Sequence, residues 1–544
     1  MATQARLGGR PAAGRGLPSR GDVGLGLLVG VLAVVTAFAV TKGVWIGIVG
    51  LIVVGAAWIA GIRDWRRSFV GLLVFLPYSG IFIIAAYPAT GPATLLKDLL
   101  FVLPLYVGFL GVHVLKGRSV AVRGFPLGLG LAFAGIVVLQ MLAPTLPNIV
   151  VGLIGAKVWL LYIPLAYVAY CFLRTREDLN LLLTVMAAAS VIPCVVGIVE
   201  GILVNTGHGD IVYSWYGDAA AAATQQFVNV GVGDATINRV PSTFSFVGQY
   251  SLFTIISISV SYAWWRGVLV PRGGVRVWMG PALLGLVALA AFLSGARGTV
   301  LAAPALIAVI LVLDGINIRT WVVAPVALAL VMTLAASIFG TGVGALLQNT
   351  WDHAISEFDI GTIQGVEHAF NHTTFGLGTG VDTVSARYAL PKFSPYALVG
   401  GRVEESWWIK ALLELGIIGL GLVIVFVLGV LRAALRAHLS VKDKGLRAIS
   451  AACCALLAYA VFFNFKGSGL DLDPLNVVFW VFVGIVLRLP VIQEEEREQE
   501  RRAGLLAAAT EEPGPDPGGD LGRAGVRPGT RAGEPLVTAL VSRR

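Results

Sequence analysis

Two arginines in the middle of the chain have the chemistry to bind a phosphate group. Arg239 lies in NRVPSTFSFVGQYSLF just before an apolar run, and Arg297 lies in LSGARGTVLA between two apolar runs. A guanidinium is always charged, and its paired N–H donors match phosphate oxygens. Gly295 and Gly298 permit a tight turn beside Arg297. The pattern favours a diphosphate ligand; the alternatives are an arginine that only marks the turn and, for Arg239, one that reaches the lipid headgroups.

The polar segment 341–405 contains a second candidate anion site. Its FGLGTG run, Phe375–Gly380, could turn several backbone N–H groups toward one ligand. This interpretation makes Gly376 and Gly378 candidate substrate-binding residues. The alternative is an ordinary glycine-rich turn.

The same segment contains histidines with spacing suited to a metal. His368 and His372 are four residues apart, and His353 precedes them. A helix would place the first two on one face, where they could hold zinc. Surface histidines in a polar loop are commoner, so we expect no metal and consider His372 as a general base. The four cysteines fall inside apolar runs and are expected to pack as small hydrophobic residues: Cys171, Cys194, Cys453 and Cys454.

The stretch ESWWIKALLELGIIGL begins an apolar run with charged residues inside it. Lys410 and Glu414 are four residues apart, so on a helix they could neutralise one another. Glu405 lies outside that pair and is a second candidate base. Arg402 and Lys410 are further candidate substrate-binding cations.

The elements that must position these residues are membrane helices. Hydrophobic residues make up 57% of the chain and charged residues 13%, and the mean hydropathy is +0.82. Runs of about twenty apolar residues, enough to cross the hydrocarbon as a helix, recur along the chain. We therefore expect an all-α polytopic membrane protein with about fourteen transmembrane helices. The expected spans are 23–40, 43–62, 68–87, 94–115, 124–142, 157–173, 180–203, 245–265, 277–294, 299–313, 320–340, 406–431, 447–465 and 474–489.

The distribution of lysine and arginine predicts the orientation. These residues gather at the N-terminus and in every second loop, and such loops stay in the cytoplasm. The expected domains are a basic cytoplasmic N-terminus (1–22), a transmembrane domain (23–489) and a disordered cytoplasmic tail (490–544), which begins with a helical EEEREQERR. Loops 205–241 and 341–405 are then extracytoplasmic. The net charge of +9 is dispersed over loops, so nucleic-acid binding is not expected.

In this orientation many ionisable residues come near the outer face, which predicts a polar cavity partly sunk in the membrane. They are Lys97, Asp98, Lys157, Glu200, Arg239, Arg297, Glu405, Lys410, Glu414, Lys466, Asp471 and Asp473.

Four of these features together resemble the O-antigen ligase and polymerase superfamily of bacterial surface-polysaccharide enzymes. They are the segment from Arg239 onward, the Ser294–Gly298 turn, FGLGTG, and WWIKALLELGIIG, which matches a family motif of the form YL-x-LL-x-E-x-GIIG. The resemblance covers roughly residues 239–425. Where the family's ligases often begin the motif helix with a His-Asn pair, this chain has Glu405-Ser406, which favours a polymerase or a divergent transferase.

The resemblance implies a GT-C-like glycosyltransferase bundle in the bacterial cytoplasmic membrane. Its donor would be an undecaprenyl-diphosphate-linked oligosaccharide held by Arg239 and Arg297, and its acceptor a glycan. It implies no metal and no cofactor, and polysaccharide-assembly proteins are possible partners. Two other classes stay open: a transporter or flippase of lipid-linked sugars, which should show two related halves, and a non-catalytic assembly subunit.

Overall fold

The computed structural model describes residues 44–87, 93–115, 117, 121–217, 229–232, 235–315, 318–383, 385–386, 406–465 and 467–510. Several predictions lie outside these residues: the N-terminal region 1–22, the span 23–40, Arg402, Glu405, Lys466 and the tail after 510.

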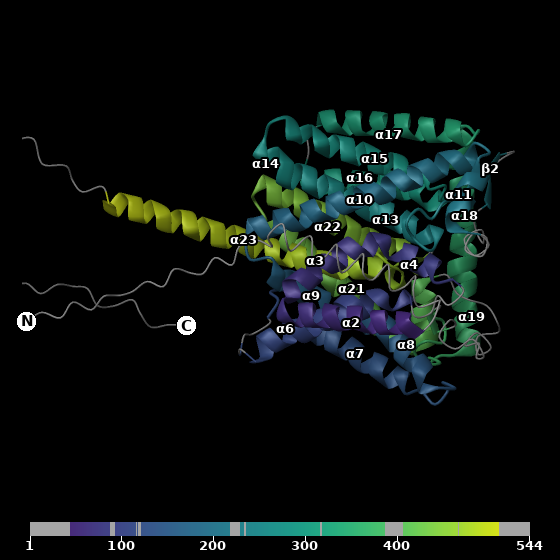
Figure 1. Ribbon diagram of the computed structural model, residues 1–544, viewed down its shortest axis with the longest axis horizontal. Helices are drawn as coiled ribbons and strands as arrows, with labels where there is room; N and C mark the ends of the chain where they lie inside the picture. Colours follow the sequence, from purple (N-terminus) through teal and green to yellow (C-terminus); the bar gives the residue numbers. More distant parts are fainter. Residues whose placement is uncertain are drawn as a thin grey trace, which may run out of the picture. The chain divides into compact units, whose positions relative to one another are not determined.

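The described chain is built almost entirely of helices (Figure 1). The helices of the first half are α2 (Val44–Arg63), α3 (Trp65–Phe75), α4 (Ser79–Ala85), α6 (Leu103–Leu115), α7 (Leu127–Met141), α8 (Ile149–Leu160), α9 (Leu165–Phe172), α10 (Arg176–Asn205) and α11 (Gly209–Tyr216). The later helices are α13 (Val247–Trp264), α14 (Val270–Arg272), α15 (Met279–Leu293), α16 (Arg297–Asp314), α17 (Ile318–Ile338), α18 (Val343–Phe358), α19 (Gly365–His372), α21 (Trp407–Ser440), α22 (Lys444–Phe462) and α23 (Leu475–Thr510). The two strands, β1 (Asn229–Val232) and β2 (Ala235–Asn238), form an antiparallel hairpin.

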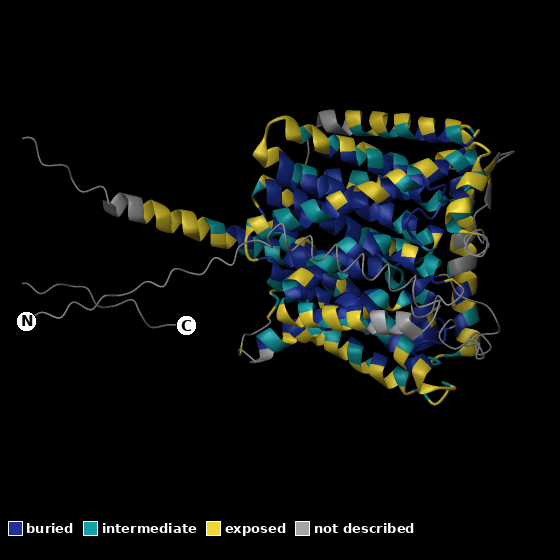
Figure 2. Ribbon diagram, viewed as in Figure 1, coloured by how far each residue is buried: buried dark blue, intermediate teal, exposed yellow. Residues whose placement is uncertain are grey.

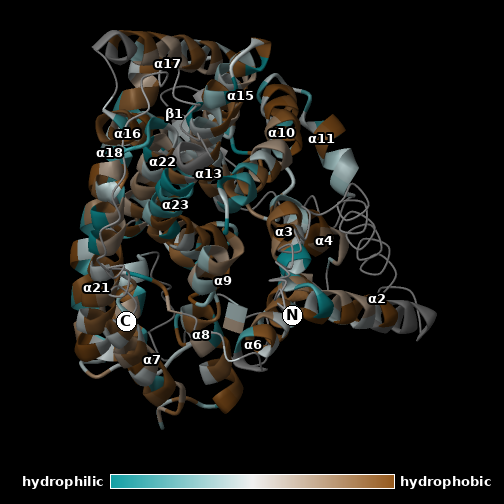
Figure 3. Ribbon diagram, turned by 90° about the vertical axis from the view of Figure 1, so that its left-hand side faces the viewer, coloured by the Kyte–Doolittle hydropathy of each residue, from teal (hydrophilic) through white to brown (hydrophobic). Residues whose placement is uncertain are grey.

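The helices are those of a membrane protein. Within the described residues, nine helices are long and apolar enough to cross a membrane, or ten if one bent pair counts as a span, and three shorter apolar helices accompany them. Large hydrophobic side chains are exposed on the outer helices: Leu139 of α7 is 68% exposed and Leu330 of α17 is 67% exposed. Figures 2 and 3 show such exposed, hydrophobic positions along α7 and α17, where lipid would cover them. The count of fourteen spans and a GT-C-like bundle remain predictions.

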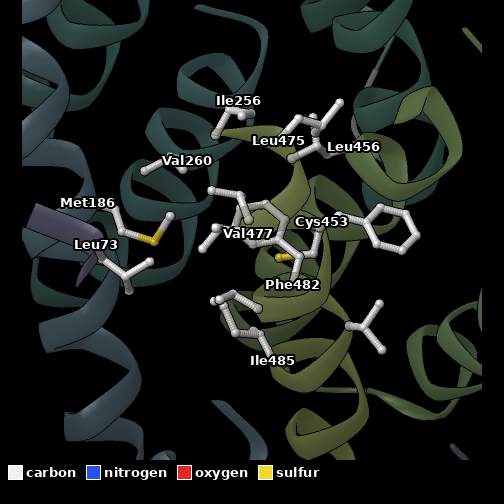
Figure 4. Packing of buried hydrophobic residues seen from close by; sticks show 14 of the residues in the cluster. Leu73, Met186, Ile256, Val260, Cys453, Leu456, Leu475, Val477, Phe482 and Ile485 are labelled. Carbon is white, nitrogen blue, oxygen red and sulfur yellow. The ribbon is translucent and has the colours of Figure 1, made fainter. Parts of the chain in front are cut away.

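The centre of the bundle is α13, which packs against α10, α15, α16 and α22. Its residues from Phe253 to Trp264 are all buried. In Figure 4 its Ile256 and Val260 lie within a cluster that also includes Cys453 of α22 and Phe482 of α23. All four cysteines are free thiols, and Cys453 is fully buried among apolar side chains, as a packing residue should be.

A long helical element lies across one end of the bundle. The chain turns by 93° between α17 and α18, and α18 continues through a π-helical stretch (Asp359–Gln364) into α19. Figure 1 shows α18 and α19 along the same side of the bundle, perpendicular to most of the spans. Much of the expected loop 341–405 is therefore a helix that covers the bundle. This side is called the α18–α19 end below.

The last helix is longer than the expected span. α23 continues through EEEREQERR, the helical start that we expected for the tail, and ends at Thr510. Its part from Glu495 onward forms a separate unit, in which Arg502 and Glu498 make an exposed ion pair.

Candidate functional site

A glycine turn places Arg297 at the beginning of α16. Gly295 has φ of +70°, a left-handed conformation that favours glycine. The N–H of Ala296 donates to Ser294 Oγ at 3.3 Å, and the Thr299 hydroxyl donates to Ala296 O at 2.7 Å. Arg297 is the first residue of this 18-residue helix, whose N-terminus has a partial positive charge. The guanidinium and the helix end therefore both favour an anion here.

The same turn holds the segment that contains Arg239. The N–H of Val240 donates to Ser294 O at 3.2 Å. The two backbones are so close that a Cβ on Gly295 would lie 2.8 Å from Asn238 O and 3.1 Å from the Cα of Arg239. Only glycine fits this contact. The structure thus brings together the two arginine segments that the sequence places far apart.

Buried polar groups fix the Arg239 segment on both sides. Before it, the Asn205 side chain accepts from Asn238 N at 2.8 Å and donates to Asn238 O at 3.0 Å. After it, Ser242 N donates to the fully buried carboxylate of Glu200 at 2.8 Å. The Tyr216 hydroxyl also donates to Glu200, and burial together with this carboxylate raises the pKa of Tyr216 well above its usual range, so the phenol remains a donor. The Arg239 backbone is therefore well ordered before any ligand binds.

The helix α18 completes this site. Arg297 Nη1 donates to Asn349 Oδ1 at 3.4 Å, and Asn349 Nδ2 donates to Gly231 O in β1 at 3.2 Å. Arg239, Arg297 and Asn349 are all half-buried. We call these three residues the arginine site. His353, also half-buried, lies one turn further along α18 on the same face as Asn349.

A second cluster of charges is buried where the segment before α6 meets the C-terminal end of α8. Asp98 accepts a hydrogen bond from Tyr162 OH at 2.9 Å and forms ion pairs with Lys157 Nζ at 2.5 Å and Lys97 Nζ at 3.4 Å. Lys97 also pairs with Asp473 at 3.0 Å. Two lysines thus balance two aspartates, and Lys97 and Asp98 are each only 4% exposed. These residues form a buried ion-pair cluster instead of lining the open cavity that we expected.

We expected Lys410 and Glu414 to pair with one another, but each has a different partner. Lys410 is 1% exposed, forms its ion pair with Asp471 and lies 5.0 Å from the centre of the Trp159 ring. Glu414 accepts instead from Trp159 Nε1 at 2.7 Å and from Asp382 N at 3.0 Å. Asp471 comes from the distant loop before α23, so helical spacing could not reveal it. Lys410 therefore forms a buried ion pair inside the bundle and is not positioned to contact a substrate.

The FGLGTG loop fills a break in α21. Gly416 has φ of +73° inside that helix, so the carbonyls before it lose their helical partners. The N–H of Leu377 donates to Leu413 O at 2.8 Å, and that of Gly378 donates to Glu414 O at 3.1 Å. Inside a membrane such carbonyls need a partner from the protein, and the loop supplies it.

The glycines of this loop allow that close contact. Gly376, Gly378 and Gly380 have φ values of +92°, +101° and +93°. The N–H of Gly376 donates to Thr373 Oγ1 at 2.9 Å. The N–H groups of Gly376 and Gly378 are thus used within the protein in this structure, and we do not place an anion on them.

His372 lies far from the arginine site. It ends α19 about six helical turns after Asn349, or roughly 35 Å along the helix. Its Nδ1 is 2.8 Å from His368 O, and the two imidazole rings are 4.3 Å apart. Within the described part of the chain, no group of three or more His, Cys, Asp or Glu side chains is arranged to hold a metal ion.

The arginines stand out in the sequence, whereas the residues that position their backbone segments do not. Asn205 and Asn349 have no motif around them and looked like ordinary polar residues beside a loop. Glu200 was recognised as a charge near the same face, but its bond to Ser242 was not foreseen. Comparison of the chain with protein-family models, curated proteins and solved structures finds no match, so function must be argued from this geometry.

Proposed function

We propose that this chain is a transmembrane glycosyltransferase of the bacterial cytoplasmic membrane. It would move a glycan from an undecaprenyl-diphosphate-linked donor to an acceptor on the extracytoplasmic face, as a polysaccharide polymerase or an O-antigen-ligase-like enzyme. The observation that carries the proposal is the arginine site: two arginines from distant segments, joined through the Val240–Ser294 hydrogen bond at the N-terminus of a helix. Two arginines whose backbone segments meet beside a helix N-terminus suit a diphosphate.

The chemistry requires stabilisation of a leaving group. The bond between the anomeric carbon and the diphosphate oxygen breaks, and its electron pair stays on the phosphate. Cations lower the barrier only if they are aimed at this developing charge. The backbone contacts around Gly295 hold the segments that carry Arg239 and Arg297 beside one another, which places both arginines on one side of the leaving group in this proposal. In this proposal no divalent metal is required.

A general base must remove the proton of the acceptor hydroxyl as that oxygen attacks. Glu405 lies outside the described residues, and His372 is roughly 35 Å away along the helix from the residue that contacts Arg297. His353 is one turn from that residue and on the same helical face. An imidazole titrates near neutral pH and suits this role. We therefore assign the base to His353 in preference to His372.

The test is a transfer assay with purified protein and lipid-diphosphate-linked oligosaccharides in chelator. We expect His353→Gln to lower kcat about 100-fold or more, on the scale of a lost general base, and to remove the limb of the pH profile that reports this group. His372→Gln is the matched control and should retain activity. The opposite result for the two histidines would refute the assignment of His353 and would favour the α19 end of the element.

The orientation needs its own test. In a variant that lacks the native cysteines, Ser356→Cys on α18 should react with a membrane-impermeant maleimide in spheroplasts. Ser440→Cys, at the opposite end of the bundle, should react only after lysis. Both residues are exposed, so access through the membrane decides the result. The reverse pattern would place the arginine site in the cytoplasm and contradict the proposal.

The second candidate function is a transporter or flippase of lipid-linked sugars. It is favoured by the buried cluster of Lys97, Asp98, Lys157 and Asp473, because ionisable groups inside membrane bundles often carry protons or ions. A flippase would move the lipid-linked sugar across a vesicle membrane and leave the diphosphate bond intact. Release of the diphosphate carrier distinguishes the enzyme from this alternative.

A further inference from the structure

The end of the bundle opposite α18 and α19 has a basic groove that the proposed function does not use. Its cavity of ≈ 440 Å³ is bordered by α21, α23 and the turn before α7. Three arginines line it: Arg123, Arg432 and Arg436. The other lining residues are apolar or glycine, among them Ala433 and Leu487. The volume is within the range of small-molecule sites, and the lining combines cations with an apolar wall.

The charge of this groove is only partly compensated. Arg123 pairs with Glu494 at 3.0 Å, and both side chains are mostly exposed. Arg432 and Arg436 are four residues apart on α21, so they lie on one face of the helix. Neither makes an ion pair or a side-chain hydrogen bond with another described residue. Two guanidiniums therefore remain available to an anion.

The groove lies where apolar segments of three helices begin or end. The apolar run of α21 ends at Leu431, and that of α23, interrupted by Arg488, ends at Ile492. The helix α7 begins its own apolar run just after Arg123. Three apolar segments thus have their ends around one cavity. In a membrane protein such ends mark the boundary between the hydrocarbon and the headgroup region.

We propose that this groove binds the phosphate of an anionic glycerophospholipid. The guanidiniums of Arg432 and Arg436 hold the phosphate oxygens, and Ala433, Leu487 and neighbouring apolar residues contact the glycerol and the first methylenes. Basic pockets between membrane helices recognise anionic headgroups in this way. The proposal concerns lipid binding and does not depend on the transferase reaction.

The test uses the full-length protein in detergent, with phosphatidylglycerol as the probe and retention measured by native mass spectrometry. Arg432→Gln/Arg436→Gln should weaken retention about 30-fold, the product of roughly fivefold for each of the two surface arginines. The control Arg63→Gln/Arg272→Gln removes two exposed arginines at other helix ends and should leave retention unchanged. Equal weakening in both double variants would overturn the groove and indicate general surface charge.

Two further measurements are needed. The first tests whether the shape of the groove matters apart from its charge, and the second tests whether the ligand is a lipid or a free phosphate. Ala433→Phe fills the groove while every arginine remains, and it should also abolish retention; unchanged retention would overturn the proposal. Inorganic diphosphate at millimolar concentration should not displace the lipid. Displacement by inorganic diphosphate would show that the site takes a soluble phosphate and would overturn the lipid assignment.

Discussion

Replacement of Arg297 by glutamine should remove activity while it leaves the fold intact. The side chain is half-buried, and its bond to Asn349 is 3.4 Å long, beyond the usual range for a strong N–H···O bond. Loss of such a bond costs about 1 kcal/mol of stability or less. The backbone contacts of the turn, which use Gly295 and Ser294, do not involve the guanidinium. These backbone contacts therefore remain in the variant, and its accumulation in the membrane is measured beside its activity.

The expected kinetic effect is much larger. Removal of one preorganised donor from a site of developing charge costs roughly 3–4 kcal/mol of barrier, or about 100-fold to 1,000-fold in kcat. Arg297→Lys keeps the charge and loses the paired donors, so it should fall between glutamine and wild type. The rate is measured as release of undecaprenyl diphosphate from a lipid-linked donor. Arg63→Gln, an exposed arginine at the end of α2, serves as the control for loss of charge alone.

The proposed role of Arg297 fails if Arg297→Gln turns over the donor at a rate within about threefold of wild type, since the change in barrier would then be under 1 kcal/mol. It also fails if Arg63→Gln loses as much activity as Arg297→Gln. If the glutamine variant does not accumulate, Arg297→Lys still tests the claim, because the lysine keeps the charge at the beginning of α16.

Three further predictions concern the framework of the site. Gly295→Ala should lower turnover about tenfold or more, because its Cβ would lie 2.8 Å from the backbone of the Arg239 segment. Gly340→Ala is the control: Gly340 has φ of +66° but open space around it, so the change should cost only about 1 kcal/mol of stability and no activity. Gly416→Ala should prevent monodisperse elution in size-exclusion chromatography, because its Cβ would meet the FGLGTG backbone at 2.3 Å, well inside contact distance. Lys410→Met should lower stability in detergent melts by about 3–5 kcal/mol by leaving Asp471 uncompensated, and added Asp471→Asn should restore most of it; a double variant as unstable as the single one would contradict the pairing.

The membrane helices could be predicted because hydropathy is a local property. The expected spans from 43–62 onward each overlap one helix or two consecutive helices, although only nine or ten helices of the described residues meet the length and composition of a full span. The expected polar loop 341–405 was misjudged in shape: its first part is the long helix from Val343 to His372. A helix on a bundle surface need not be apolar on all sides, so mean hydropathy does not reveal it.

The candidate site was predicted in its residue types and not in its contacts. Arg239 and Arg297 stood out because cations at the ends of apolar runs are costly without a role. The contact between their segments depends on the hydrogen bond from Val240 to Ser294, which lie more than fifty residues apart in the sequence. A local sequence pattern could not predict it. Lys410 and Glu414 do lie on one helix with the expected spacing, yet Lys410 forms its ion pair with Asp471, which is distant in sequence.

The most direct test of the central claim is single-turnover transfer from a purified undecaprenyl-diphosphate-linked oligosaccharide in the presence of chelator. Wild-type protein should release the diphosphate carrier and extend an acceptor glycan, and Arg239→Gln and Arg297→Gln should each abolish both products. Carrier release by wild type that persists in both arginine variants would contradict the role of the arginine site. Movement of the intact donor across a vesicle membrane without carrier release would contradict the transferase itself.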